Sequence, residues 1–162
     1  MMVEEKSVLL ETDTVEKPMT VLFVCTGNTC RSPMAAAVLN DLAARVNQKN
    51  PPYRAMSAGL YANDGELMSQ GARTALERAK IGGAHGVHRA CTVNEGLLAA
   101  CDVIVGISSR HAMALMQAFP QFASKITVMK RDIADPFGQD DEVYDRCLEE
   151  ITECVKEMFT LD

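Results

Sequence analysis

The sequence predicts an α/β fold, a single-domain doubly wound sheet of about four parallel strands with helices on both faces. Three near-continuous apolar runs, VLFV, DVIVGI and KITVM, are too short for helices and are typical of strands buried on both faces. The segments between them place apolar residues every three or four positions, which is the period of a helix. Strands that alternate with helices favour a parallel sheet with right-handed crossovers, and 162 residues fit one domain.

The first half of the chain contains two of the expected strands. Residues 21–24 form the first, and the helix after it carries an apolar face on Met34, Val38, Leu42 and Val46. The sequence NQKNPP at 47–52 ends that helix, because proline cannot continue one. We expect a second strand over Tyr53–Ser57, then a loop and a helix over Ser69–Lys80 that closes at Gly82-Gly83.

The second half repeats the alternation. A short helix around Asn94–Ala100 precedes the strand DVIVGI, and the next helix runs from Ser109 to Phe119 and stops at Pro120. KITVM supplies the fourth strand. After the loop RDIADPFGQDD, a final amphipathic helix places apolar side chains at steps of three or four, on Val143, Cys147, Ile151, Cys154 and Met158.

Residues 1–20 read as an acidic N-terminal extension to a domain at 21–162, because they carry five acids and no sustained period. The fragment VLLET within them could instead add a short edge strand. A net charge of −6 argues against nucleic acid or a polybasic membrane anchor as a partner. No apolar run approaches the roughly 20 residues of a membrane span, and no signal peptide is evident. We therefore expect a cytoplasmic protein.

The six cysteines show no CxxC spacing, which favours free thiols over a disulfide framework. His85, His88 and Cys91 lie close together in the sequence, but structural zinc needs four ligands at paired spacings. We therefore expect neither a metal nor a cofactor.

The segment CTGNTCR, residues 25–31, joins the first strand to a helix that begins near Ser32-Pro33. Proline suits a first helical turn, whose N–H groups lack intrahelical partners. The loop amides and the helix dipole can converge on an anion there. Gly27 permits tight curvature, and Asn28 tolerates left-handed geometry. The pattern predicts a phosphate-binding loop.

Four side chains, three in or next to this loop and one from a distant segment, are suited to phosphoryl transfer. Arg31 can bind two phosphoryl oxygens with its planar fork. Cys25 lies in the same positive field, which favours the nucleophilic thiolate, and Ser32 can donate to it. Asp135 follows the fourth strand and so reaches the same edge of the sheet, where it can supply a proton to a leaving group. Nearby acids are expected to be solvated loop charges: Asp132, Asp140 and Asp141.

With these motifs in hand, the chain resembles the low-molecular-weight protein tyrosine phosphatases over about residues 20 to 160. The resemblance rests on VCTGNTCRSPMA, on SAG at 57–59, on H-x-A at 88–90 and on the late DPF. It implies that Cys25 attacks phosphorus, that Arg31 and the loop bind phosphate, and that Asp135 protonates the leaving atom and then activates water. The loop residues implied in phosphate binding are Thr26, Gly27, Asn28, Thr29, Cys30 and Ser32.

The resemblance also implies supporting roles. Ser57 and His88 would hold Asn28 in place behind the loop. Cys30 would form a reversible disulfide with Cys25 and so protect it from irreversible oxidation.

The substrate depends mainly on Thr29. Tyrosine phosphatases of this type usually carry an aliphatic residue there, whereas CTGNTCRSP resembles the loop of bacterial protein-arginine phosphatases of the same fold. We expect the loop of Leu60, Tyr61, Ala62 and Asn63, together with Phe137, to form the pocket wall around a phosphorylated protein side chain. The alternatives are a tyrosine phosphatase, an arsenate reductase and a non-catalytic phosphate-binding module. A monomer or weak dimer is expected.

Overall fold

The computed structural model describes residues 17–82 and 87–162. One sheet contains four strands in the order β2-β1-β3-β4, and every pair of neighbours is parallel. The predicted parallel sheet of four strands is therefore confirmed, although the first strand begins earlier than Val21. The strands are β1 (Met19–Cys25), β2 (Tyr53–Gly59), β3 (Val103–Gly106) and β4 (Ile126–Val128).

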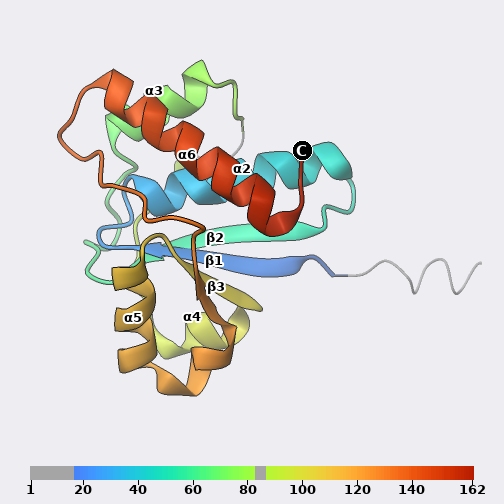
Figure 1. Ribbon diagram of the computed structural model, residues 1–162, viewed down its shortest axis with the longest axis vertical. Coiled ribbons are helices and arrows are strands. Elements are labelled where there is room, and N and C mark those ends of the chain that lie inside the picture. Colours follow the sequence, from blue (N-terminus) through green and yellow to red (C-terminus); the bar gives the residue numbers. More distant parts are fainter. Residues whose placement is uncertain (1–16, 83–86) are drawn as a thin grey trace, which may run out of the picture.

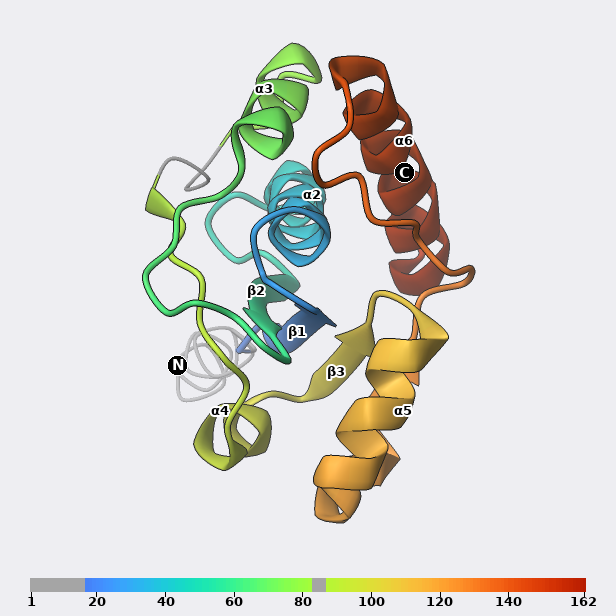
Figure 2. The ribbon, with the colours of Figure 1, turned by 90° about the vertical axis from the view of Figure 1, so that its left-hand side faces the viewer.

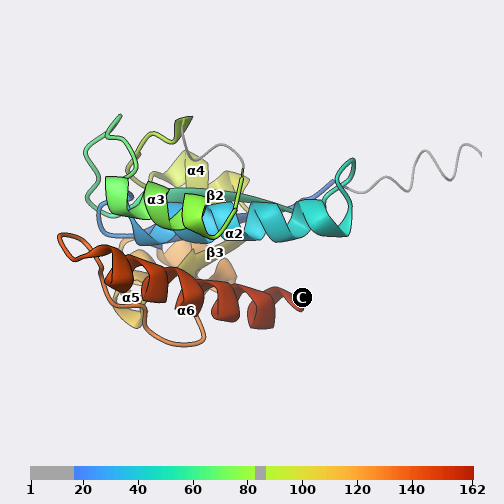
Figure 3. The same cartoon turned by 90° about the horizontal axis from the view of Figure 1, so that it is seen from above.

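Helices cover both faces of this sheet, as predicted (Figure 1). One face carries a layer of three helices that lie side by side when seen from above (Figure 3): α2 (Arg31–Val46), α3 (Gln70–Arg78) and α6 (Asp141–Phe159). The other face carries two helices and a 3₁₀ helix: α4 (Glu95–Ala100), α5 (Ser109–Ala118) and η2 (Pro120–Lys125).

Helix ends follow the capping residues. Ser69 is not inside α3 but caps it, with its Oγ accepting the Ala72 N–H at 3.3 Å, and the helix ends at Arg78 rather than Lys80. Asn94 caps α4 and Asp140 caps α6 in the same way. Gly83 in the predicted closing turn, His85 and the fragment VLLET lie outside the described residues.

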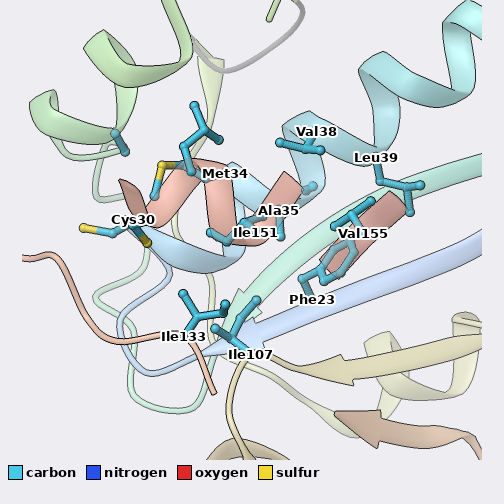
Figure 4. Close-up of a cluster of buried hydrophobic side chains, with 14 of the residues drawn as sticks. Phe23, Cys30, Met34, Ala35, Val38, Leu39, Ile107, Ile133, Ile151 and Val155 are labelled. Atoms are coloured by element: carbon cyan, nitrogen blue, oxygen red, sulfur yellow. The ribbon is translucent and has the colours of Figure 1, made fainter. Parts of the chain in front are cut away.

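Two hydrophobic clusters sandwich the sheet. Side chains alternate along β1, so that Phe23 packs under α2 and α6 while Leu22 and Val24 pack toward α4 and α5. Figure 4 shows Phe23 beside Leu39 of α2 and Val155 of α6. Because its neighbours enclose β1 on both faces, the carboxyl end of this strand is held in a fixed place.

That carboxyl end lies where the chain order of the sheet reverses, since β1 pairs with β2 on one side and with β3 on the other. Ligands of such sheets bind outside the strand ends at this switch point. Figure 2 looks onto that end, where the loops leaving β1, β2 and β3 gather with the loop that precedes α6. Among the helices of the described residues, none is long and apolar enough to cross a bilayer.

Candidate active site

The loop between β1 and α2 presents unpaired backbone donors. In the ranges 17–82 and 87–162, no acceptor binds any backbone N–H from Gly27 to Arg31. The first turn of α2 contains no acidic residue, so nothing there competes for the positive end of the helix dipole. The loop therefore offers a concave set of N–H groups suited to an anion.

The Cys25 thiol lies at the end of β1 and is 3% exposed. Its Sγ is 2.9 Å from the Ser32 Oγ in the first turn of α2. Asn28 Nδ2 donates to the same Oγ at 2.9 Å, which leaves the hydroxyl proton to point elsewhere. The other acceptor within reach, the Ala58 carbonyl oxygen, is more distant at 3.4 Å. When Cys25 is ionised, the Ser32 hydroxyl is therefore oriented to donate to the sulfur.

Asn28 holds the loop through its side chain and its carbonyl, and it is fully buried. Its Nδ2 also donates to Ser57 Oγ at 2.9 Å, and its Oδ1 accepts the Cys91 N–H at 3.0 Å. Its carbonyl oxygen accepts from His88 Nε2 at 2.8 Å. Burial lowers the pKa of His88, which favours the neutral ring. Because a carbonyl oxygen can only accept, the proton of that ring is on Nε2. With φ at 59°, Asn28 adopts a left-handed conformation that most residues avoid.

Arg31 is buried beside the loop and contacts the segment that follows β4. Its Nη1 donates to the Ile133 carbonyl at 3.1 Å, and its Nη2 lies 3.7 Å from Asp135 Oδ2. The Asp135 carboxylate is 53% exposed, and its Oδ1 accepts the Phe137 N–H at 3.2 Å. The fold thus brings Cys25, Arg31 and Asp135 together from two distant parts of the sequence.

These residues line one cavity of about 320 Å³. Residues 25–31 form its floor, and the residues above them are Asn63, Glu66, Asp135 and Phe137. The expectation that Leu60 and Tyr61 line the pocket needs correction. Neither residue is among those that line the cavity, although their backbone N–H groups donate to the carbonyls of Cys25 and Thr26. Leu60 packs in the cluster below α4, and Tyr61 is 82% exposed.

Thr29 and Cys30 complete the floor. Thr29 is 9% exposed, and its Oγ1 lies 3.8 Å from the Cys30 Sγ. That sulfur also contacts Ser69 Oγ at 3.2 Å and the Tyr144 hydroxyl at 3.4 Å. Burial and the contact with Cys30 raise the pKa of Tyr144 to about 12, so its hydroxyl stays protonated. The Cys30 thiol is thereby linked to α3 and α6 as well as to the loop.

The other acidic residues near Asp135 accept hydrogen bonds at helix N-termini or form a surface ion pair. Asp132 accepts the Ser109 N–H and hydroxyl at the start of α5, both at 2.9 Å. Asp140 caps α6, and Asp141 lies 3.7 Å from Arg78. None of the three lines the cavity. The described part of the chain also holds no group of His, Cys, Asp or Glu side chains arranged to bind a metal.

Sequence reasoning assigned no role to two residues that shape the loop, although Gly59 belongs to the SAG motif at 57–59. His111 is fully buried in α5, where its Nδ1 accepts the Ser108 N–H at 3.1 Å and its Nε2 donates to Thr26 Oγ1 at 3.0 Å. Burial and the nearby Arg31 lower its pKa to about 4, so the ring is neutral. Gly59 lies so close to the loop that a Cβ there would sit 2.5 Å from the Thr26 carbonyl oxygen.

Several known proteins are similar to this chain in sequence and fold. A protein-arginine-phosphatase of Geobacillus stearothermophilus is 35% identical over 141 residues, which cover 83% of this chain and 89% of that protein. The crystal structure of a low molecular weight protein tyrosine phosphatase from T. tengcongensis is 32% identical, with a TM-score of 0.79 over 88% of this chain and 98% of that one.

A third similar structure is the C7S mutant of the YwlE arginine phosphatase with a phosphorylated active site serine. It is 27% identical, and its TM-score is 0.79 over 88% of this chain and 94% of that one. The family profile of low molecular weight phosphotyrosine protein phosphatases matches residues 20–161. The chain therefore belongs to this family of cysteine-based protein phosphatases.

Proposed function

We propose that this phosphatase removes phosphate from arginine side chains of proteins through a phosphocysteine intermediate. One observation carries the proposal: the Cys25 sulfur, oriented by Ser32, lies on the floor of a cavity that also contains unpaired loop amides, the Arg31 guanidinium and the Asp135 carboxylate. A nucleophile, an anion-binding nest and an acid thus face the same small volume.

In the proposed reaction the Cys25 thiolate attacks phosphorus in line with the departing nitrogen. The loop N–H groups and Arg31 stabilise the charge on the phosphoryl oxygens. Asp135 gives its proton to the nitrogen as the N–P bond breaks. Water then attacks phosphorus while Asp135 accepts a proton from it; the S–P bond breaks, Cys25 leaves as the thiolate, and phosphate is released. The phosphorylated serine in the similar C7S structure supports a phosphorylated enzyme.

Thr29 supports arginine rather than tyrosine as the phosphorylated residue. Thr29 is one of the residues that line the cavity floor, and a hydroxyl-bearing residue there suits a guanidinium with several N–H donors better than a phenyl ring. The similar arginine phosphatase of Geobacillus stearothermophilus points the same way. Phe137 does not decide between the two, because an aromatic ring can stack on either group. The similar tyrosine phosphatase structure favours the alternative.

The test compares turnover of a phosphoarginine peptide and a phosphotyrosine peptide by the native protein and by Thr29→Ile. We expect the native protein to prefer phosphoarginine and the variant to shift at least tenfold toward phosphotyrosine. A native preference for phosphotyrosine would overturn the arginine assignment and leave a tyrosine phosphatase. Peptides of matched flanking sequence serve as the internal control.

We further propose that the enzyme acts in the cytoplasm as a monomer or weak dimer. We also propose that Cys30 protects Cys25 from irreversible oxidation by peroxide. Peroxide converts the Cys25 thiolate to a sulfenic acid with release of water or hydroxide, and the Cys30 thiol then condenses with it to a disulfide with loss of water. Dithiothreitol would restore activity. Equal recovery of the native protein and of Cys30→Ser after peroxide would contradict the protective role.

A further inference from the structure

The walls of the cavity above the phosphate loop are mostly acidic and polar. Of the residues that line it outside 25–31, Glu66 and Asp135 are carboxylates, Asn63 is an amide, and Phe137 is the one apolar side chain described there. A phenyl ring gains most from apolar walls, whereas a guanidinium gains from planar acceptors. The composition of the wall therefore differs from what a phosphotyrosine ring needs.

Glu66 has a fixed backbone and an exposed side chain. Its N–H donates to the Asn63 carbonyl at 3.0 Å across a turn, with Gly65 at a φ of 89° that favours glycine. Its carbonyl accepts the Ala90 N–H at 2.8 Å, and the Gly65 N–H donates back to Ala90 at 2.8 Å. These bonds hold Glu66 beside the cavity from both sides.

The Glu66 carboxylate makes no ion pair or hydrogen bond within residues 17–82 and 87–162. The neighbouring acid, Asp64, differs from Glu66 in two ways. Its Oδ1 accepts the Thr92 N–H at 3.0 Å, and the residue does not line the cavity. Asp135, the other carboxylate of the wall, already lies near Arg31. Glu66 thus remains as an acceptor for a positively charged ligand above the phosphate.

We propose that Glu66 is a specificity-determining residue that accepts N–H groups of the guanidinium in a phosphoarginine side chain. This rests on the proposed function and extends it. Glu66 comes from the connection between β2 and α3, and Asp135 comes from the connection between β4 and α6, so the leaving group is contacted from two walls. A phenol offers Glu66 neither charge nor N–H donors, so this contact discriminates between the two substrates.

The experiment measures kcat/KM of native protein, Glu66→Gln and Asp64→Asn for matched phosphoarginine and phosphotyrosine peptides. Loss of one charge-assisted hydrogen bond should lower kcat/KM for phosphoarginine in Glu66→Gln by about tenfold. Turnover of phosphotyrosine should stay level or rise, because a negative charge near a dianion has been removed. Asp64→Asn removes the same charge from the same turn and should leave both values unchanged. The effect of Glu66→Gln should also shrink in high salt, because the carboxylate is exposed.

The outcomes separate this inference from the function on which it rests. If the native protein does not hydrolyse phosphoarginine, the proposed function fails. If it does, but Glu66→Gln leaves the ratio of the two kcat/KM values as in the native protein, only the role of Glu66 fails. An equal change in that ratio in Asp64→Asn would also refute the role, because it would point to general charge rather than contact.

Discussion

Replacement of Asn28 by alanine should loosen the phosphate loop more than any other single polar truncation nearby. Its side chain makes hydrogen bonds to Ser32 and Ser57 at 2.9 Å and to the Cys91 N–H at 3.0 Å. Three bonds at about 1 kcal/mol each give about 3 kcal/mol. Alanine held at a φ of 59° adds about 1 kcal/mol of strain. The free energy of unfolding should therefore fall by about 4 kcal/mol.

The assays are denaturant unfolding, thermal unfolding and inhibition by inorganic phosphate. We expect the melting temperature of Asn28→Ala to fall by about 10 °C, since 1 kcal/mol corresponds to about 2–4 °C in a domain of this size. We also expect phosphate inhibition to weaken by at least about tenfold, because the loop amides no longer share one orientation.

Asn40 offers a matched control. Its side chain bonds both backbone groups of Ala55, at 2.8 and 3.1 Å, but it lies on the surface of α2 and outside the cavity. Asn40→Ala loses two hydrogen bonds, so it should lower stability by about 2 kcal/mol and leave phosphate inhibition unchanged. The reasoning is refuted if Asn28→Ala loses no more stability than Asn40→Ala, or if it binds phosphate as the native protein does.

Two further predictions concern the two residues to which sequence reasoning assigned no role. Gly59→Ala should cost about 1–3 kcal/mol in unfolding free energy and lower kcat/KM, because its Cβ would sit 2.5 Å from the Thr26 carbonyl oxygen; Gly82→Ala, which meets nothing within 4 Å, should change neither. The pKa of His111 is lowered to about 4 in the folded protein, so as the pH falls the unfolded chain takes up this proton before the folded one does. The contribution of neutral His111 to stability is therefore complete above about pH 6.5 and is lost as the pH falls to about 4. Unfolding of His111→Asn, followed against pH, should show a shallower decline across that window, and a decline as steep as in the native protein would contradict this assignment.

The sequence predicted the parts of the molecule that depend on local pattern. The apolar run before Cys25 can only be a buried strand, and the residues up to Arg31 carry a complete local motif. The position of Asp135 near Cys25 could be predicted from the topology, because the carboxyl ends of parallel strands lie at the same edge of the sheet. The absence of Leu60 and Tyr61 from the cavity lining could not be predicted, since it depends on how the loop after β2 packs against the phosphate loop. The link from His111 to Thr26 spans 85 residues and follows no spacing rule.

The charge of the whole chain bears on the choice of substrate. A net charge of −6 repels anions at a distance, yet the cavity floor collects positive potential from unpaired amides, a helix N-terminus and the buried Arg31. Two carboxylates, Glu66 and Asp135, stand above that floor. A phosphorylated phenol offers Glu66 neither positive charge nor N–H donors at this level of the cavity. A phosphorylated guanidinium places positive charge and N–H donors at the level of the carboxylates and its phosphate on the floor, so its own charge pattern matches that of the cavity.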